Sequence, residues 1–160
     1  MKLRHLLIAA CAMTTSTASA QKALYIPNEW KAQRTDTLLY NETDTETKYT
    51  WSKSRSKESD NFIVYWDKYY GNTIPTNAPS TYKVDVDDLL KKAEFFYSLN
   101  IGKLAFCDEN NSKVSKYKMM ILLNHTTDWV CYGGGYDDMI GALWLSPNTC
   151  KPVGHSVAHE

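Results

Sequence analysis

The sequence predicts an α+β fold in which a small, twisted, mixed sheet is backed by one helix. Three observations lead to this prediction. Short continuous runs of β-branched and aromatic residues are typical of buried strands, one stretch has apolar residues at helical spacing, and the segments follow the order strand, helix, strand, strand, helix. A chain of 160 residues is long enough for one domain with a hydrophobic core.

The first strand and the helix lie at the start of the organised part of the chain, which begins at about residue 61. The run Phe62–Trp66 is apolar throughout and predicts a buried strand. Asp85 is a good N-cap, because its carboxylate can accept hydrogen bonds from the N–H groups of the first helical turn. Gly102 fits just past the end of the helix. The apolar positions at helical spacing are Val86, Leu89, Leu90, Ala93, Phe96 and Tyr97.

Two more strands are expected towards the C-terminus. Tyr117–Leu123, apolar apart from Lys118, predicts a second buried strand, and Gly141–Ser146 predicts a third. Between them, Gly133–Gly135 predicts a flexible loop. Asp137 and Asp138 predict a turn, because the spacing of oxygen ligands in a calcium-binding loop is absent.

The first 20 residues have the three parts of a secretory signal peptide. Lys2 and Arg4 provide a basic start, residues 6–13 are apolar, and residues 18–20 (Ala-Ser-Ala) form a small-residue cleavage site. The apolar stretch is too short to span a membrane as a helix. We therefore expect cleavage before Gln21 and a protein that is secreted, periplasmic or at the cell surface.

The cysteines leave two questions open. Cys11 could be the acylated cysteine of a lipoprotein, but the apolar run before it, residues 6–10, is short, which favours ordinary export. An oxidising compartment would permit one disulfide among Cys107, Cys131 and Cys150, and the sequence does not select the pair. No Cys-x-x-Cys spacing supports a zinc site made of cysteines.

The polar composition of residues 21–60 predicts a lead-in segment, and residues 61–160 are the domain itself.

The charge of the chain narrows the classes of partner that are expected. Removal of Lys2 and Arg4 with the leader leaves 16 of the 18 basic residues against 18 acidic ones, a formal charge of −2. Nucleic-acid-binding proteins typically carry a clustered basic face, so no nucleic-acid partner is expected. No segment after the leader is apolar and long enough to span a membrane.

The C-terminal residues contain the first half of a zinc motif. In His-Glu-x-x-His, two histidines one helical turn apart bind zinc and the glutamate acts as general base. His159 and Glu160 match the first two positions, and residues 152–160 are typical of the beginning of a helix, with Pro152 suited to the first turn. His155 lies on the same helical face, but pairing it with His159 matches no hydrolytic spacing. We interpret the chain as the front part of a longer protein, interrupted inside its catalytic helix.

The stretch from about residue 62 to residue 160 resembles a secreted bacterial family of zincin-like metallopeptidases, largely known as a domain of unknown function. The resemblance rests on Asn61–Trp66, Tyr82–Leu90, Tyr117–Ile121, Gly135–Asp138, Ile140–Trp144 and Ala158–Glu160. It implies the N-terminal subdomain of a zincin-like fold, incomplete at the C-terminus.

The same resemblance implies the roles of the site residues. His159 would be the first zinc ligand and Glu160 the general base, with zinc as the cofactor of the full-length protein and weak zinc binding by these 160 residues alone. The strand before the catalytic helix would be an edge strand on which an extended peptide substrate pairs. Its residues are Gly141, Ala142, Leu143 and Trp144.

The predicted function is therefore that of an N-terminal fragment of a secreted zinc metallopeptidase, which hydrolyses peptide bonds with metal-activated water and is inactive as this fragment. The alternative is a non-catalytic exported module that binds a glycan or a protein. Trp129, Tyr132 and Trp144 could form a sugar-binding platform, although aromatic residues on strands usually pack in the core. His125 is expected to be a structural histidine.

Overall fold

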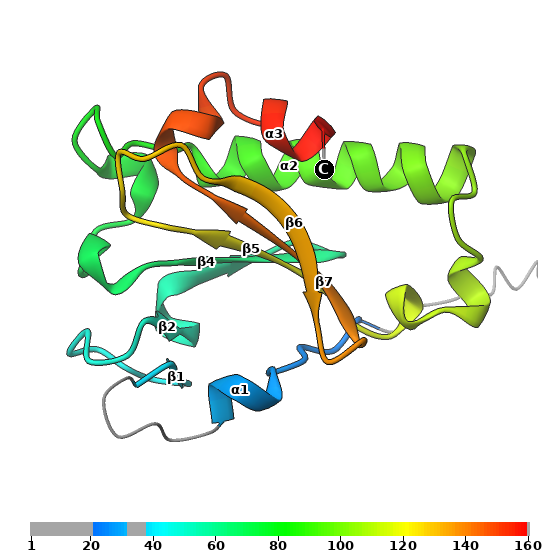
Figure 1. The fold of residues 1–160 in the computed structure, drawn as a ribbon, viewed down its shortest axis with the longest axis horizontal. Coiled ribbons are helices and arrows are strands. Elements are labelled where there is room, and N and C mark those ends of the chain that lie inside the picture. The colour runs from blue at the N-terminus through cyan, green and yellow to red at the C-terminus, as the bar shows by residue number, and fades with distance from the viewer. Residues whose placement is uncertain (1–20, 32–37, 160) are drawn as a thin grey trace, which may run out of the picture.

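The fold is a five-stranded mixed sheet with its longest helix on one face, as Figure 1 shows for the computed structural model. The structure describes residues 21–31 and 38–159. The predicted leader, Cys11 and the candidate base Glu160 lie outside the described residues. The predicted α+β class, with a mixed sheet and a backing helix, is confirmed.

The strand order in the sheet is β3-β4-β5-β7-β6. The central strands β4, β5 and β7 are parallel, and the outer strands β3 and β6 run antiparallel to their neighbours. A separate parallel pair, β1 (Tyr40–Asn41) and β2 (Trp51–Ser52), lies beside it. The strands of the sheet are β3 (Ser56–Glu58), β4 (Phe62–Trp66), β5 (Met119–Leu123), β6 (Cys131–Tyr136) and β7 (Ile140–Leu145).

Helix α2 (Val86–Tyr97) is the main backing element. The Asp85 carboxylate accepts hydrogen bonds from the N–H groups of Asp87 at 3.1 Å and Asp88 at 3.0 Å, as its position in the sequence predicts. The chain continues from α2 as a π-helical segment, Ser98–Lys103, which includes Gly102. The other α-helices of the described residues are α1 (Asn28–Lys31) and α3 (His155–His159), and 3-10 turns lie at Lys53–Arg55, Lys68–Tyr70, Pro75–Asn77, Glu109–Asn111, Lys113–Ser115 and Pro147–Cys150.

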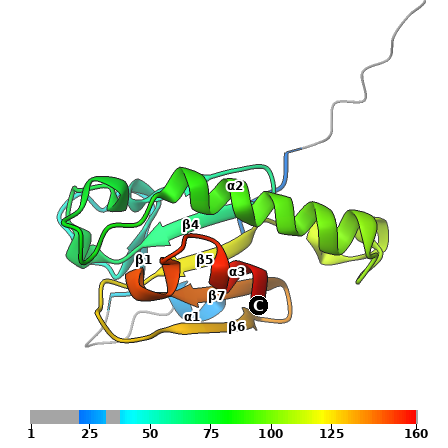
Figure 2. The same cartoon turned by 90° about the horizontal axis from the view of Figure 1, so that it is seen from above.

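The predicted position of the edge strand was wrong. Strand β7 is paired on both sides, with β5 and with β6, so it is an inner strand. The chain leaves β5, forms β6 at the outer edge, and returns through a tight turn that inserts β7 beside β5. Figure 2, seen from above, shows β6 at the rim of the sheet. The residues assigned to the edge were Gly141, Ala142, Leu143 and Trp144.

The glycine run predicted as a loop is the middle of β6. Gly134 is the register partner of Ala142, and Gly135 is the partner of Gly141. Ladder hydrogen bonds use only backbone groups, so glycine can pair at an edge despite its low strand propensity. The turn predicted at Asp137 and Asp138 is confirmed: their φ angles are +55° and +54°, and they connect β6 to β7.

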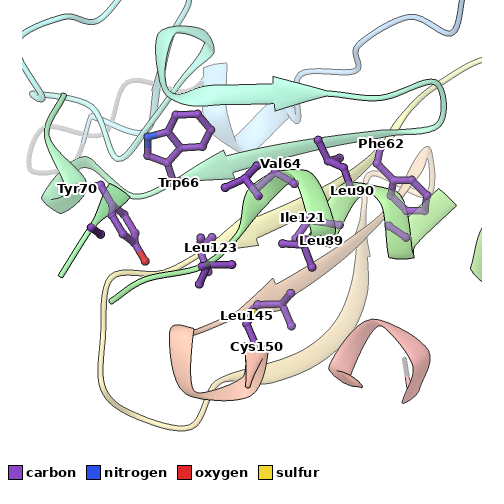
Figure 3. Packing of buried hydrophobic residues seen from close by; sticks show 14 of the residues in the cluster. Phe62, Val64, Trp66, Tyr70, Leu89, Leu90, Ile121, Leu123, Leu145 and Cys150 are labelled. Carbon is purple, nitrogen blue, oxygen red and sulfur yellow. The ribbon is translucent and has the colours of Figure 1, made fainter. Parts of the chain in front are cut away.

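Two hydrophobic clusters fill the two faces of the sheet. Figure 3 shows the cluster under α2, where Val64, Ile121 and Leu145 meet helix residues Leu89 and Leu90. The opposite face is closed by aromatic residues, among them Trp30 and Trp51, which contact Tyr65 and Met120 in a second cluster.

The polar lead-in is therefore more structured than its composition suggests. Residues 21–60 contribute Trp30, Trp51 and strand β3 to the domain. Within residues 21–31 and 38–159, no helix combines the length and the apolar character needed to cross a membrane.

Candidate functional site

Helix α3 carries the candidate zinc ligand His159 at its last described position. Ser156, which is buried, donates a hydrogen bond from its hydroxyl to the carbonyl oxygen of Thr149 at 2.6 Å. Val157 packs against the cluster under α2. His155 and His159 lie one helical turn apart and are both exposed. The helix is thus fixed by one face and presents its two histidines to solvent.

The start of α3 is set by its contact with α2. Gly154 has a φ of +84°, a conformation that side-chain-bearing residues rarely adopt. A Cβ atom at Gly154 would lie 2.3 Å from Cδ and 2.9 Å from Cβ of Lys92. Pro152 was expected in the first turn of the helix, but α3 begins at His155 and Pro152 lies before it. The N–H of His155 donates to the carbonyl oxygen of Pro152 at 3.3 Å.

The segment between β7 and α3 is tied to the start of β6. Ser146 and Thr149 form a reciprocal capping box around the 3-10 turn Pro147–Cys150. The Thr149 hydroxyl lies 2.9 Å from the carbonyl oxygen of Val130, to which it donates. The Ser146 N–H donates to the same carbonyl oxygen at 3.0 Å. These contacts position α3 relative to the edge strand β6.

An apolar cavity of about 450 Å³ lies where α2, α3, β6 and β7 meet. Val157 of α3 lines it, two residues before His159, and so do Gly133 and Gly134 of β6. The hydrophobic side chains around it include Phe62, Phe96, Ile101, Phe106 and Leu143. Helix α3, which carries the candidate ligand, and the edge strand β6 therefore border the same apolar hollow.

Of the predicted zinc motif, His159 is the one position among the described residues. Across residues 21–31 and 38–159, no three or more His, Cys, Asp or Glu side chains gather in a group that could hold a metal ion. The imidazole of His159 is exposed and chemically suited to zinc, but hydrolytic zinc sites use three protein ligands. The imidazole nitrogen of His159 is a donor that zinc accepts, but the described residues provide fewer than the three protein ligands of a hydrolytic site.

A second polar cluster, which the sequence reasoning missed, lies at the carboxyl ends of β4 and β5. His125 stacks on Tyr82 with ring centroids 3.8 Å apart and meets Tyr70 edge-on at 4.7 Å. Burial raises the pKa of Asp67, and a hydrogen bond from the Tyr69 N–H at 2.9 Å, together with the nearby His125, counteracts part of that rise. The signal in the sequence is that Asp67 follows one buried strand and His125 follows the next, since parallel strands end at the same edge of a sheet.

Two of the three aromatic residues considered as a sugar platform are exposed, although packing in the core was the expectation for all three. Trp129 is 72% exposed and Tyr132 is 52% exposed. Tyr132 stacks on Trp144 with ring centroids 4.8 Å apart and an interplanar angle of 8°. Trp144 alone of the three packs against a buried cluster.

Comparison with known proteins gives a family without a known activity. The chain belongs to a family of unknown function, DUF6055, whose model matches residues 16–160. No curated protein and no solved structure matches the chain.

Proposed function

We propose that this member of the family is the N-terminal part of a secreted zinc metallopeptidase of zincin-like fold. The observation that carries the proposal is the place of α3: Val157 of this helix lines the cavity that Gly133 and Gly134 of edge strand β6 also line, and His159 follows Val157 on the same helix. A substrate chain at β6 would adjoin the cavity that α3 borders. Zinc, when bound, makes a coordinated water acidic near neutral pH.

The residues of the chain have separate roles in this proposal. His159 is the first zinc ligand, and a second histidine is expected three residues after Glu160. Glu160 is the general base that accepts the proton of the attacking water. Ser156 and Gly154 act as positioning residues, because they hold α3 against Thr149 and Lys92.

The substrate is assigned to β6 instead of β7. Strand β6 pairs with β7 on one side and forms the rim of the sheet. Its glycines carry no side chains, so an extended peptide can approach the backbone closely and add a further strand. The exposed residues Gly134 and Gly135 are at the centre of this strand. An apolar substrate side chain would face the adjoining cavity.

Export is part of the same proposal. The leader ends at a small-residue site before Gln21, which gives a secreted, periplasmic or surface-bound enzyme. Mass spectrometry of the protein recovered from its host should find Gln21 at the N-terminus. A terminus at lipid-modified Cys11 would contradict this and assign the protein to a membrane surface.

The test uses the full-length gene product and three substitutions. Glu160→Gln should keep zinc bound and lower peptidase turnover by about 10²–10⁴-fold or more, because the amide cannot accept a proton. His159→Ala should lose zinc and activity together. His155→Ala, on the same helical face, should keep both. Near-normal turnover of the Glu160→Gln enzyme would exclude the proposed role of this helix.

A second candidate function is a glycan-binding module, which the exposure of Trp129 and Tyr132 favours. Flat exposed aromatic side chains are suited to stacking against sugar rings. Trp129→Ala should then weaken retention on an insoluble polysaccharide, while Phe95→Ala, an exposed aromatic on α2, should leave it unchanged. Equal retention of the two variants would exclude glycan binding at Trp129.

A further inference from the structure

We propose that Cys131 and Cys150 form a disulfide bond that joins the start of edge strand β6 to the end of the 3-10 turn before α3. The sequence leaves the pairing among three cysteines open, and the fold selects one pair. The oxidising compartment that maintains the bond rests on the proposed secretion of the protein, whereas the choice of pair rests only on the fold.

The two cysteines lie on the same face of the sheet. Cys131 is the register partner of Leu145, and cross-strand partners project from the same face. Figure 3 shows Cys150 beside Leu145 in the cluster under α2. Cys150 belongs to the buried cluster on this face, and Cys131 packs against that cluster.

Backbone contacts bring the neighbouring residues together. The carbonyl oxygen of Val130 accepts hydrogen bonds from the N–H of Ser146 at 3.0 Å and from the hydroxyl of Thr149 at 2.9 Å. Val130 directly precedes Cys131, and Thr149 directly precedes Cys150. Burial raises the pKa of the Cys150 thiol to about 12, a hydrogen bond with Thr149 counteracts part of the rise, and Cys131 adds to it.

Cys107 lies at the other end of α2. Its thiol is 3.8 Å from the Ser112 hydroxyl, and the N–H of the preceding Phe106 donates to the Asn100 carbonyl oxygen at 3.0 Å, just past the end of α2. Lys151, which follows Cys150, donates instead from its Nζ to the carbonyl oxygen of Ser80 at 3.2 Å, before the start of α2. A helix of 12 residues is about 17 Å long. Disulfides require Cα atoms within about 7 Å, so Cys107 cannot reach Cys150.

The oxidation is a two-electron thiol–disulfide exchange. The more exposed Cys131 attacks the disulfide of an oxidising protein and forms a mixed disulfide, and the sulfur of Cys150 then displaces the oxidant. Two S–H bonds break and one S–S bond forms. The two electrons reduce the oxidant, and the two protons end on its released thiols or in solvent.

The bond would fasten the edge strand to the segment that leads into α3. It closes the segment from residue 131 to residue 150, which includes all of β6 and β7. The glycine-rich strand has few side chains to hold it in place, so a covalent link at its first residue limits its separation from α3. In the proposed enzyme this keeps the substrate strand next to the zinc helix.

The test is thiol mapping of the purified mature protein after oxidation with oxidised glutathione. Denaturation and alkylation without reduction should label Cys107 alone, and reduction should expose all three thiols. Cys131 and Cys150 share one tryptic segment, because no Lys or Arg lies between Lys118 and Lys151. Additional cleavage before Asp137 separates them, so the two fragments should stay joined until reduced. Labelled Cys131 and Cys150, or a link through Cys107, would overturn the proposal.

Two variants give the matched comparison. Cys107→Ser should keep the link, and reduction should lower its Tm by roughly 5–10 °C. Cys107→Ser with Cys150→Ala should show no such response to reduction, and an equal response would overturn the proposal. Because glutathione oxidises the protein in vitro, failure of the pairing is distinct from failure of export.

Discussion

The hydroxyl of Ser156 donates a hydrogen bond to the carbonyl oxygen of Thr149 at 2.6 Å, and this bond joins the first turn of α3 to the turn that follows β7. Ser156 is only 3% exposed, so water cannot take its place. The capping box that holds Thr149 also contacts the start of β6. The position of His159 relative to the edge strand therefore depends on a short chain of buried polar contacts.

Substitution Ser156→Ala should destabilise the protein by about 1–2 kcal/mol, because it leaves the Thr149 carbonyl without this partner in a buried site. Ser98→Ala is the matched control, since the exposed Ser98 hydroxyl donates to the Phe95 carbonyl at 2.8 Å. There water can replace the lost bond, and the change should be within about 0.5 kcal/mol. Urea unfolding measures both variants. Equal losses would mean that burial of the Ser156 bond has no energetic effect.

Substitution Gly154→Ala should cost about 2–3 kcal/mol, which combines backbone strain with a clash against Lys92. The control is Gly102→Ala. Gly102 has no positive φ, and a Cβ there meets nothing within 4 Å. The free energy of unfolding should change by less than about 0.5 kcal/mol in this variant. Thermal unfolding compares the two variants, and an equal change in both would contradict the packing of α3 on α2.

The buried ion pair between Asp44 and Arg55 should make stability fall at acid pH. Burial tends to raise the pKa of Asp44, but hydrogen bonds from the Tyr49 N–H and from Arg55, at 3.0 and 3.2 Å, hold it below its usual value. A lowered folded-state pKa stabilises the fold above the unfolded pKa of about 3.9, and this contribution is lost as pH falls through the folded value.

Asp44→Asn should therefore flatten the acid limb of the stability curve below about pH 4 and lower stability at pH 7 by roughly 2–4 kcal/mol, because Arg55 stays buried without its counter-charge. Glu46→Gln is the control. Glu46 forms an exposed ion pair with Lys48, and its loss should cost less than about 1 kcal/mol. Denaturant unfolding between pH 2.5 and pH 7 gives both quantities. An unchanged acid limb in Asp44→Asn would show that another carboxylate controls it.

Local patterns predict the strongest elements of the fold. The continuous apolar run Phe62–Trp66 predicts a strand that is buried on both faces, and the structure has this strand. Asp85 predicts the start of α2, where its side chain caps the first turn. Strand β6 could not be predicted in this way, because its glycines lie opposite Leu143 and Ala142 through backbone pairing with β7, to which they contribute no side chains.

The same limit applies to the site. The His-Glu dipeptide and its helical context can be read locally, but the cavity beside it unites Phe62, Phe96 and Leu143, which are far apart in the sequence. The order of β7 and β6 is likewise a property of the assembled sheet. Burial of Trp30 under the sheet follows from tertiary contacts that the polar composition of its neighbours conceals.

The last prediction concerns zinc binding by the purified chain of residues 21–160. A hydrolytic zinc centre needs three protein ligands, and the described residues offer His159 alone in the predicted frame. Titration with zinc should therefore give a Kd weaker than about 1 µM, and a general protease assay should detect no chelator-sensitive cleavage. His159→Ala serves as the control and should bind zinc no tighter than the parent chain. Stoichiometric binding tighter than micromolar that His159→Ala abolishes would mean that these residues complete a metal site by themselves, which would contradict the assignment of the remaining ligands to positions after Glu160.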